Sequence, residues 1–383
     1  MKKKCLVGVL SACLIFASIL GGCSGKEEEN TTAPISLDAP SQNDTIDEVS
    51  DDEVSIDPGV DKSQYYVTAT PAPEGKAYSE LTGLLIDEDI KNQRPLAIMV
   101  DNEKTALAHY GLNDCDIVYE MVNSTLNDHI TRLMCIIKDW EGIERLGSVR
   151  STRVTNCYLA GEYNAILCHD GGPYYINEYV NKKEIDHLSG VFSRISNGKP
   201  REFTEYVTGS DLQKYIINSD SISREYNEFY TEDHFNFAPK KAMELNDYTS
   251  ERTASDKIEL PYKHNGSKLF YNSDTNKYEY YEYGDYHKDA VTNEVLTFDN
   301  VIIQKAHMGV YDEHGYMVFD IVYNNGVGYY IADGKCVDIT WEREGLIDNT
   351  IFKDASGEPV VLNAGKTYIA IVPEDDWDDV VIQ

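Results

Sequence analysis

Four short and nearly continuous apolar runs most constrain what this chain can fold into. Each has the length of one strand, and they are Pro95–Val100, Ile117–Val122, Leu133–Ile137 and Ala165–Cys168. Continuous apolar runs bounded by polar residues are typical of strands that are buried on both faces. Apolar residues at helical spacing over residues 151–163 and 211–218 add helices, so this part of the chain is predicted to be mixed α/β.

The second half of the chain has a different pattern. Strand-like segments recur between residues 268 and 372, many of them rich in tyrosine, and glycines and short polar turns separate them. This spacing is typical of antiparallel sheet. We therefore expect an α+β protein with a mixed α/β domain over residues 76–250 and a Tyr-rich antiparallel β domain over residues 251–383.

The N-terminus carries an export signal. Three lysines at residues 2–4 precede an apolar run over residues 5–20, which is too short to span a membrane and predicts a signal peptide over residues 1–22. The run ends in Leu20-Gly21-Gly22-Cys23, which resembles the lipobox of bacterial lipoproteins. That resemblance implies cleavage before Cys23 and lipidation of the Cys23 thiol, with palmitate as an expected acyl chain. The alternative is an ordinary secretory signal followed by an incidental cysteine.

A doubly acylated cysteine holds a protein stably at a membrane without a spanning helix. The predicted location is therefore the extracytoplasmic face of the cell membrane. Residues 23–75 follow as an acidic segment that is poor in aromatic residues and has no sustained apolar period. Such a segment cannot bury enough surface to offset its ordering entropy, so we expect a disordered linker. An acidic tail that binds a basic partner is the alternative.

The net charge excludes two classes of partner. The chain has 34 Lys+Arg against 66 Asp+Glu, which gives a formal net charge of −32. Nucleic-acid binding needs a basic face, and adhesion to anionic lipid needs a polybasic patch. We therefore expect no nucleic-acid partner, and contact with the membrane only through the Cys23 lipid.

The cysteines and histidines show no metal-ligand spacing. After the predicted cleavage and lipidation, five cysteines remain in the body, and no two of them form a CxxC pair. Most lie in apolar contexts, which predicts buried structural thiols. His109, His187 and His307 are not spaced as ligands of one ion. The sequence therefore predicts neither a metal site nor a cofactor.

A group of arginines is the strongest candidate for a binding site. Arg132 lies near one apolar run, and Arg150, Ser151 and Arg153 lie at the start of the helix predicted over residues 151–163. With Ser151 as the N-cap, the two arginines flank a helix N-terminus, where backbone N–H groups already favour an anion. Forked guanidinium groups match a carboxylate or a phosphate. We therefore expect Arg132, Arg150, Ser151 and Arg153 to bind an anionic ligand.

Three polar residues near the predicted strand ends are candidates for catalysis or for charge pairing. His169 and Asp170 follow one apolar run and precede a Gly-Gly turn, and Glu120 lies inside another run. In one interpretation, Glu120 and Asp170 neutralise the arginines in a buried structural network. In the other, His169 is an acid/base residue oriented by Asp170, and Arg150 and Arg153 clamp an anionic substrate.

These motifs resemble a known family. Residues 94–102, 111–120 and 130–132, the stretch Gly147-Ser148-Val149-Arg150-Ser151-Thr152-Arg153, and residues 169–172 are similar to the YerB-like lipoproteins built on domain-of-unknown-function family 3048. The segments 300–304, 339–341 and 365–367 resemble its C-terminal part. The family pattern usually has Pro where this chain has Ser148. The resemblance implies an exported, membrane-tethered protein in two parts, and it supplies no catalytic residues.

Two functional hypotheses follow. The first is a non-enzymatic envelope lipoprotein that binds an anionic ligand or an envelope protein, for which the many tyrosines offer a contact surface. The second is an envelope hydrolase or transferase that uses His169 and Asp170 with the Arg150 and Arg153 clamp. We favour the non-enzymatic hypothesis, because no motif of a well-characterised enzyme class is present. The two differ in whether the arginines, Glu120 and His169 converge on one open cleft.

Overall fold

The computed structural model describes residues 61–248 and 255–383. The predicted signal peptide, Cys23, most of the predicted linker and residue 250 lie outside these residues. Residues 61–75, expected to belong to the linker, are packed against the body. Lys62 forms an ion pair with Asp354, with 3.0 Å between Nζ and Oδ2, and Val67 is buried. The folded part therefore begins earlier than expected, because Tyr66 and Val67 supply apolar surface within an otherwise polar stretch.

The four apolar runs form four strands of one mixed, ten-stranded sheet. All four of these strands are buried along their whole length, as the continuous apolar pattern predicts. In spatial order the strands are β22 (Ile351–Lys353), β21 (Lys335–Arg343), β20 (Asn324–Ala332), β17 (Asn300–Ala306), β24 (Thr367–Pro373), β4 (Ile117–Val122), β5 (Thr131–Ile137), β3 (Leu96–Asp101), β7 (Ile166–His169) and β8 (His187–Ser189).

Strands from both halves of the chain pair within this sheet. β24 lies between β17 and β4 and is parallel to both, with Ala370 opposite Glu120 on β4. The expectation of a purely antiparallel second half is therefore wrong for this sheet, in which β17 and β24 are parallel neighbours. The apolar pattern of β24 predicts a buried strand, but a pattern of burial does not specify which strand lies beside it.

A second sheet is built entirely from the second half, and its pairings are all antiparallel as expected. Its strands are β15 (Asp285–Tyr286), β14 (Lys277–Glu282), β13 (Lys268–Asn272), β12 (Lys257–Glu259), β25 (Val381–Ile382) and β16 (Thr297–Phe298). Shorter pairings complete the strands: β6 (Arg145–Gly147) with β10 (Glu205–Thr208) and β9 (Ser193–Arg194), β1 (Lys76–Tyr78) with β2 (Leu85–Asp87), β11 (Asn236–Ala238) with β23 (Val361–Asn363), and β18 (Met308–Val310) with β19 (Met317–Phe319).

Helices are few and short, so the structure is α+β with a stronger β character than expected. The α-helices are α1 (Leu126–His129), α2 (Val154–Glu162), α3 (Asn177–Val180) and α4 (Gly209–Leu212), and one π-helical turn covers Gln213–Ile217. Single 3₁₀ turns occupy Lys62–Tyr65, Val67–Ala69, Glu88–Ile90, Lys104–Ala106, Leu112–Asp114, Arg201–Phe203 and Ala242–Leu245, and a longer 3₁₀ helix occupies Glu374–Asp379.

Helix α2 begins three residues later than predicted, and Ser151 is not its N-cap. The N-cap is Arg153, whose backbone N–H donates to Asn156 Oδ1 at 3.0 Å. The preceding residues are not helical, because the backbone of Arg150 bonds to β3 on one side and to the residue after β7 on the other. Arg150 N–H donates to Met99 O on β3 at 2.9 Å, and Asp170 N–H, just after β7, donates to Arg150 O at 3.0 Å.

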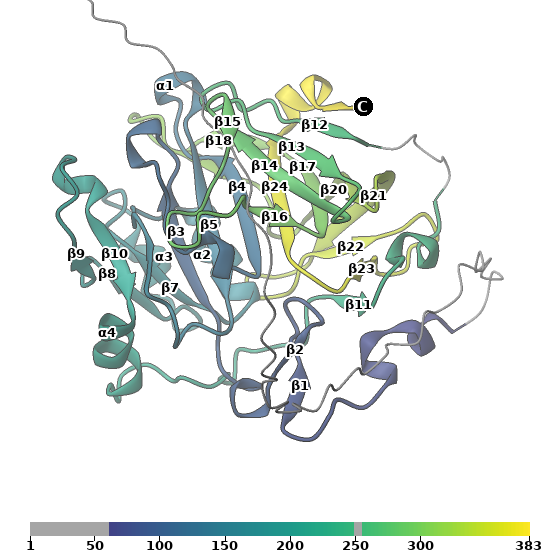
Figure 1. The fold of residues 1–383 in the computed structure, drawn as a ribbon. Helices are drawn as coiled ribbons and strands as arrows, with labels where there is room; N and C mark the ends of the chain where they lie inside the picture. Colours follow the sequence, from purple (N-terminus) through teal and green to yellow (C-terminus); the bar gives the residue numbers. More distant parts are fainter. Residues whose placement is uncertain (1–60, 249–254) are drawn as a thin grey trace, which may run out of the picture. The chain divides into compact units, whose positions relative to one another are not determined.

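At β4, the side chains on the two faces of the large sheet contact different elements. Tyr119 points to the face covered by α2, where its hydroxyl donates to Glu162 Oε1 at 3.2 Å. Glu120, the next residue, points to the opposite face and accepts a bond from Tyr280 on β14 at 2.9 Å. Figure 1 shows the labelled strands of both sheets and α2, which contacts β7 and, through Asn156, reaches Met134 on β5. The β4–β5 region thus separates two polar clusters.

Two further features of the body bear on the sequence expectations. All five cysteines that the structure describes are buried, as predicted for structural thiols. Among the described residues, no helix combines the length and the apolar character needed to cross a membrane.

Candidate functional site

Arg132, Arg150 and Arg153 form one cluster on the α2 face of the large sheet. Arg132 is on β5, Arg150 is in the extended segment before α2, and Arg153 caps that helix. An Arg132 guanidinium N–H donates to the carbonyl oxygen of Ser151 at 2.6 Å, which places this side chain beside the segment that joins the other two arginines. The predicted grouping of the three guanidiniums with Ser151 is therefore present in the fold.

Local backbone geometry makes this grouping possible. Gly147 has φ of +145°, and a Cβ atom at this position would meet the backbone nitrogen of Val149 at 2.8 Å. Only glycine fits here, and it turns the chain from β6 into the extended segment that carries Arg150.

Arg150 has acidic partners, although not the two that were expected. It forms ion pairs with Asp101 at the end of β3 and with Glu202, the latter at 3.0 Å. The predicted partners, Glu120 and Asp170, form no ion pair with any of the three arginines. Asp101 takes this role because it lies opposite Arg132 in the β3–β5 ladder and so shares the face of the sheet on which the arginines lie.

Arg132 and Arg153 are buried cations without a carboxylate partner. Their exposed fractions are 5% and 6%, and neither forms an ion pair with an acid in the part of the chain that the structure describes. Burial, together with the neighbouring arginines, lowers the pKa of Arg132 to about 9, and burial lowers the pKa of Arg153 to about 10. The Nε atom of each is buried and has no hydrogen-bond partner.

Tyrosines from two parts of the chain border the arginine cluster. The Arg153 guanidinium lies over the ring of Tyr316, 4.0 Å from its centroid. Tyr311, on the same β18–β19 hairpin, packs against Tyr175 with 4.2 Å between ring centroids. Tyr174 beside it is 80% exposed. Sequence analysis missed Tyr316, because it lies more than 160 residues from Arg153 and no local pattern connects them.

His169 and Asp170 do not form the expected pair. His169 Nδ1 bonds to Gly171 O at 2.7 Å, its Nε2 bonds to His187 Nδ1 at 3.0 Å, and burial lowers its pKa to about 4. Asp170 instead forms an ion pair with Arg194 at 2.7 Å. Asp170 therefore does not orient the His169 ring, because adjacent residues at a strand end point in different directions. A catalytic role for either residue stays a prediction.

Glu120 lies on the other face of the sheet, in a buried network of neutral donors. Its carboxylate accepts bonds from the side chains of Asn102, Thr131, Asn265, Ser267, Tyr280 and Tyr368. Burial raises its pKa from the ordinary glutamate value. These donors come from both halves of the chain, so Glu120 joins the two sheets, while its part in catalysis stays a prediction.

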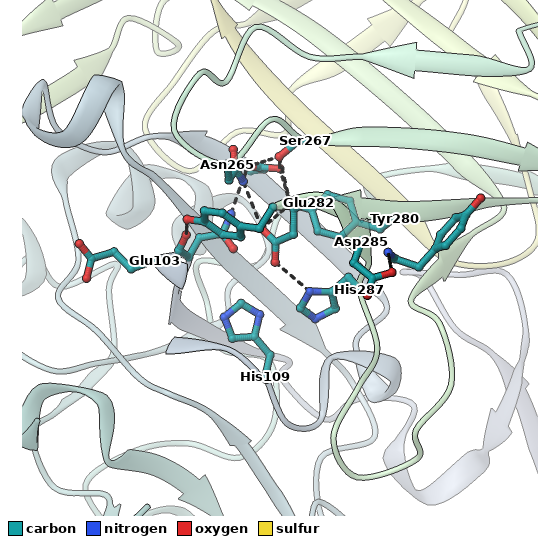
Figure 2. A network of polar contacts seen from close by, with 12 residues as sticks. Glu103, His109, Asn265, Ser267, Tyr280, Glu282, Asp285 and His287 are labelled. Carbon is teal, nitrogen blue, oxygen red and sulfur yellow. Dashed lines mark hydrogen bonds and ion pairs between the residues drawn. The ribbon is translucent and has the colours of Figure 1, made fainter. Parts of the chain in front are cut away.

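The same network contains residues that the sequence did not single out. Asn265 Nδ2 also donates to Glu282 Oε2 at 3.2 Å, and Glu282 Oε1 accepts from His287 Nδ1 at 2.8 Å. Figure 2 shows that His109 lies next to this pair, with its ring facing Glu282 and His287. Glu282 and His287 come from one hairpin, but five residues of separation is too common a spacing to have indicated a site.

Two surface pockets lie apart from both clusters. One, of about 220 Å³, is bounded by residues 231–232 and 342–351. The other, of about 370 Å³, lies beside Trp377 and strands β20 and β21. Neither is lined by an arginine of the cluster or by a residue of the Glu120 network.

Comparison with known protein families gives two matches that together cover most of the body. The model described as "Protein of unknown function (DUF3048) N-terminal domain" matches residues 81–223, and that described as "Protein of unknown function (DUF3048) C-terminal domain" matches residues 258–369. The matches lie on either side of residue 250. The division of the fold into domains over residues 76–250 and 251–383 stays a prediction, since strands of both stretches share the large sheet.

Two individual comparisons also give matches over most of the chain. The chain is 24% identical over 321 residues to "Putative lipoprotein YerB" of Bacillus subtilis (strain 168), an alignment that covers 80% of this chain and 90% of that protein. The crystal structure of the YerB protein from Bacillus subtilis matches with a TM-score of 0.68 and 21% identity, covering 80% of this chain and all of that one. The two chains therefore share a fold.

Proposed function

The chain carries both the N-terminal and the C-terminal DUF3048 domains, and we propose that it is a lipoprotein that binds an anionic ligand of the cell envelope. Its lipid is attached to Cys23 and holds it at the extracytoplasmic face of the membrane. The support for the anchor is the signal that ends in Cys23 and the word lipoprotein in the name of the Bacillus relative. The ligand site is the arginine cluster.

One observation carries the ligand proposal: Arg132 and Arg153 are buried and positively charged, and no described carboxylate pairs with either. Removing a guanidinium from water is costly unless an opposite charge compensates for it. Asp101, the acid closest in the sheet register, is already paired with Arg150. An anion bound between Arg132 and Arg153 supplies the missing charge and accepts bonds from their free Nε–H groups.

The surroundings of the cluster suit a ligand that has both an anionic group and an uncharged part. The first turn of α2 directs backbone N–H groups and the positive end of its dipole toward the residues that precede it. Tyr174 and Tyr311 are exposed, and each packs against the buried Tyr175. They offer aromatic surface on which a sugar ring or a side chain of a partner packs. A carboxylate- or phosphate-bearing envelope component has this chemistry.

The test is the response of the full-length chain, purified in detergent, to inorganic phosphate. At constant ionic strength, phosphate is expected to raise the thermal unfolding midpoint with a saturable dose dependence, because it binds only the folded state. Acetate serves as the carboxylate probe. Arg153→Met is expected to abolish the response, and without phosphate it is expected to be at least as stable as the original chain, since it removes an uncompensated buried charge.

Arg224→Met is the matched control, because Arg224 forms an exposed ion pair with Glu141 far from α2 in the sequence. It is expected to keep the phosphate response. The proposal fails if neither anion shifts the unfolding midpoint of the original chain, or if folded Arg153→Met responds as the original does.

The enzymatic alternative has less support from the geometry. It requires His169 to exchange protons with a substrate, yet both ring nitrogens are already bonded, to Gly171 and His187. It also requires Asp170 as the orienting acid, and Asp170 is paired with Arg194. We therefore propose ligand binding without catalysis.

A further inference from the structure

We propose that His109, Glu282 and His287 form a binding site for a divalent transition-metal ion of the zinc class. One ligand-type atom of each residue lies within 4.8 Å of the others. All three side chains are buried, with exposed fractions of 0% for His109, 3% for Glu282 and 5% for His287. This site lies on the face of the large sheet opposite to the arginine cluster, and it is independent of the function proposed above.

The hydrogen bonds of His109 leave a bare nitrogen that faces the site. Its Nε2 lies 2.6 Å from the backbone carbonyl oxygen of Asp101, which can only accept, so the ring proton is on Nε2. Nδ1 is then an unprotonated nitrogen with a free lone pair. This atom is buried and has no hydrogen-bond partner. A carbonyl that fixes the tautomer of a histidine in this way is a usual second-shell feature of metal sites.

His287 and Glu282 supply the other two ligand atoms. His287 Nδ1 lies 2.8 Å from Glu282 Oε1, and the two atoms share one proton when no ion is bound. An ion of charge +2 that is bound by both atoms replaces this proton. The unpartnered Nδ1 of His109 is the third ligand atom, and a buried imidazole nitrogen without a partner is costly unless something binds it. Figure 2 shows that the two rings and the Glu282 carboxylate point toward one another.

The charge of the network also favours a cation. Glu120 and Glu282 share Asn265 and Tyr280 as donors, and no Lys or Arg in the described ranges forms an ion pair with either acid. Among the described residues, the basic groups that act on Glu282 are the rings of His287 and His109. An ion of charge +2 bound by His109, Glu282 and His287 compensates for the buried Glu282 carboxylate.

The donor set selects the class of ion. Two imidazole nitrogens and one carboxylate oxygen match zinc sites, which often use two His and one Glu with an open fourth position. Calcium and magnesium prefer oxygen ligands and more of them. Cobalt(II) and nickel(II) accept the same set, so they are suitable probes.

Such an ion would join the two family domains. His109 follows β3 within the N-terminal match, whereas Glu282 ends β14 and His287 follows β15 within the C-terminal match. Ala290 N–H also donates to His109 O at 2.8 Å, so the backbone already aligns the two segments. Because the unfolded chain does not hold the three ligands together, binding of the ion is expected to stabilise the folded state.

The test is metal binding by the full-length chain after treatment with a chelator. Zinc(II) is titrated in competition with a chromophoric chelator, and cobalt(II) is titrated while its visible d–d absorption is recorded. One ion per chain is expected, together with a cobalt spectrum of low-coordinate nitrogen and oxygen ligation and a rise in the unfolding midpoint. His109→Gln and His287→Gln are each expected to weaken zinc binding at least tenfold.

His314→Gln is the matched control, since His314 is an exposed histidine on the β18–β19 hairpin. It is expected to bind zinc as the original chain does. The proposal is overturned if the original chain binds no ion in stoichiometric amount, or if both glutamine variants are folded by circular dichroism and retain the original affinity.

Discussion

The buried charged side chains of this protein differ in how completely their hydrogen bonds are satisfied. Glu120 is surrounded by neutral donors that include Ser267 and Tyr280, so its lone pairs are satisfied without a cation. Arg132 and Arg153 have bonds to backbone carbonyls, but an Nε–H of each is left over. A satisfied buried group holds the fold together, whereas an unsatisfied one of the same burial is open to a ligand, an ion or an ordered water.

The shifted pKa of His169 leads to a pH prediction. Burial lowers it to about 4 in the folded state, while an unfolded chain has the ordinary value near 6.5. Between these values the unfolded state binds one more proton than the folded state, so this residue makes the free energy of unfolding fall as the pH falls from about 6.5 to about 4. The contribution is about 1.4 kcal/mol per pH unit.

Urea titrations at several pH values measure this slope. His169→Gln, which does not titrate, should show a slope that is shallower by about one proton, whereas the exposed-site variant His314→Gln should not. Equal slopes for His169→Gln and the original chain would mean that His169 is already charged when folded.

At the scale of elements, α2 is fixed to the large sheet by a buried ion pair. Arg343 on β21 and Glu162 on α2 are completely buried, with 3.0 Å between Nη1 and Oε2. The same carboxylate oxygen accepts from Thr350 N–H and from its hydroxyl, and Arg343 also donates to Tyr158 O. This pair joins α2, from the N-terminal part of the chain, to β21 in the C-terminal part. It therefore helps to position the helix that Arg153 caps.

Breaking this pair from one side should cost much stability. Arg343→Met leaves the Glu162 carboxylate buried and uncompensated, which is expected to lower the free energy of unfolding by about 3–5 kcal/mol. Arg224→Met, which breaks the exposed pair with Glu141, should cost at most about 1 kcal/mol. Chemical denaturation measures both. A loss below 1 kcal/mol for Arg343→Met would show that Glu162 finds water or another donor.

The elements also show what the sequence could and could not predict. β3, β4, β5 and β7 were predicted because a continuous apolar run has few alternatives to a buried strand. The position of β24 beside β4 was not predicted, since apolar periodicity carries no information about which strands pair. For the site, local sequence brought Arg150 and Arg153 together, whereas Tyr316 and the pairing of Arg150 with Asp101 depend on tertiary contacts.

At the scale of the whole molecule, the two family matches meet inside one sheet. β24 hydrogen-bonds to β17 on one side and to β4 on the other, and donors from both parts satisfy Glu120. Both polar clusters are assembled from the two parts of the chain. In the first, Arg153 contacts Tyr316. In the second, His109 lies close to Glu282 and His287. Each cluster therefore needs both parts of the chain.

The predicted anchor is tested on the whole protein in cells. Because the only long apolar segment lies before Cys23, Cys23→Ala is expected to leave the chain either uncleaved or released from the membrane. Fractionation and the electrophoretic mobility of the mature form measure this. Cys23→Ala that is still processed and still partitions with membranes as the original does would contradict the lipid anchor.

The central claim is that an anion binds between Arg132 and Arg153. Its most direct test is a crystal structure of the protein grown in selenate, a tetrahedral oxyanion whose selenium is located by anomalous scattering. The account predicts an anomalous peak within hydrogen-bonding reach of both guanidiniums, with oxygens on their free Nε–H groups. Selenium peaks only at other sites, or Arg132 and Arg153 paired with carboxylates of the protein itself, would contradict it.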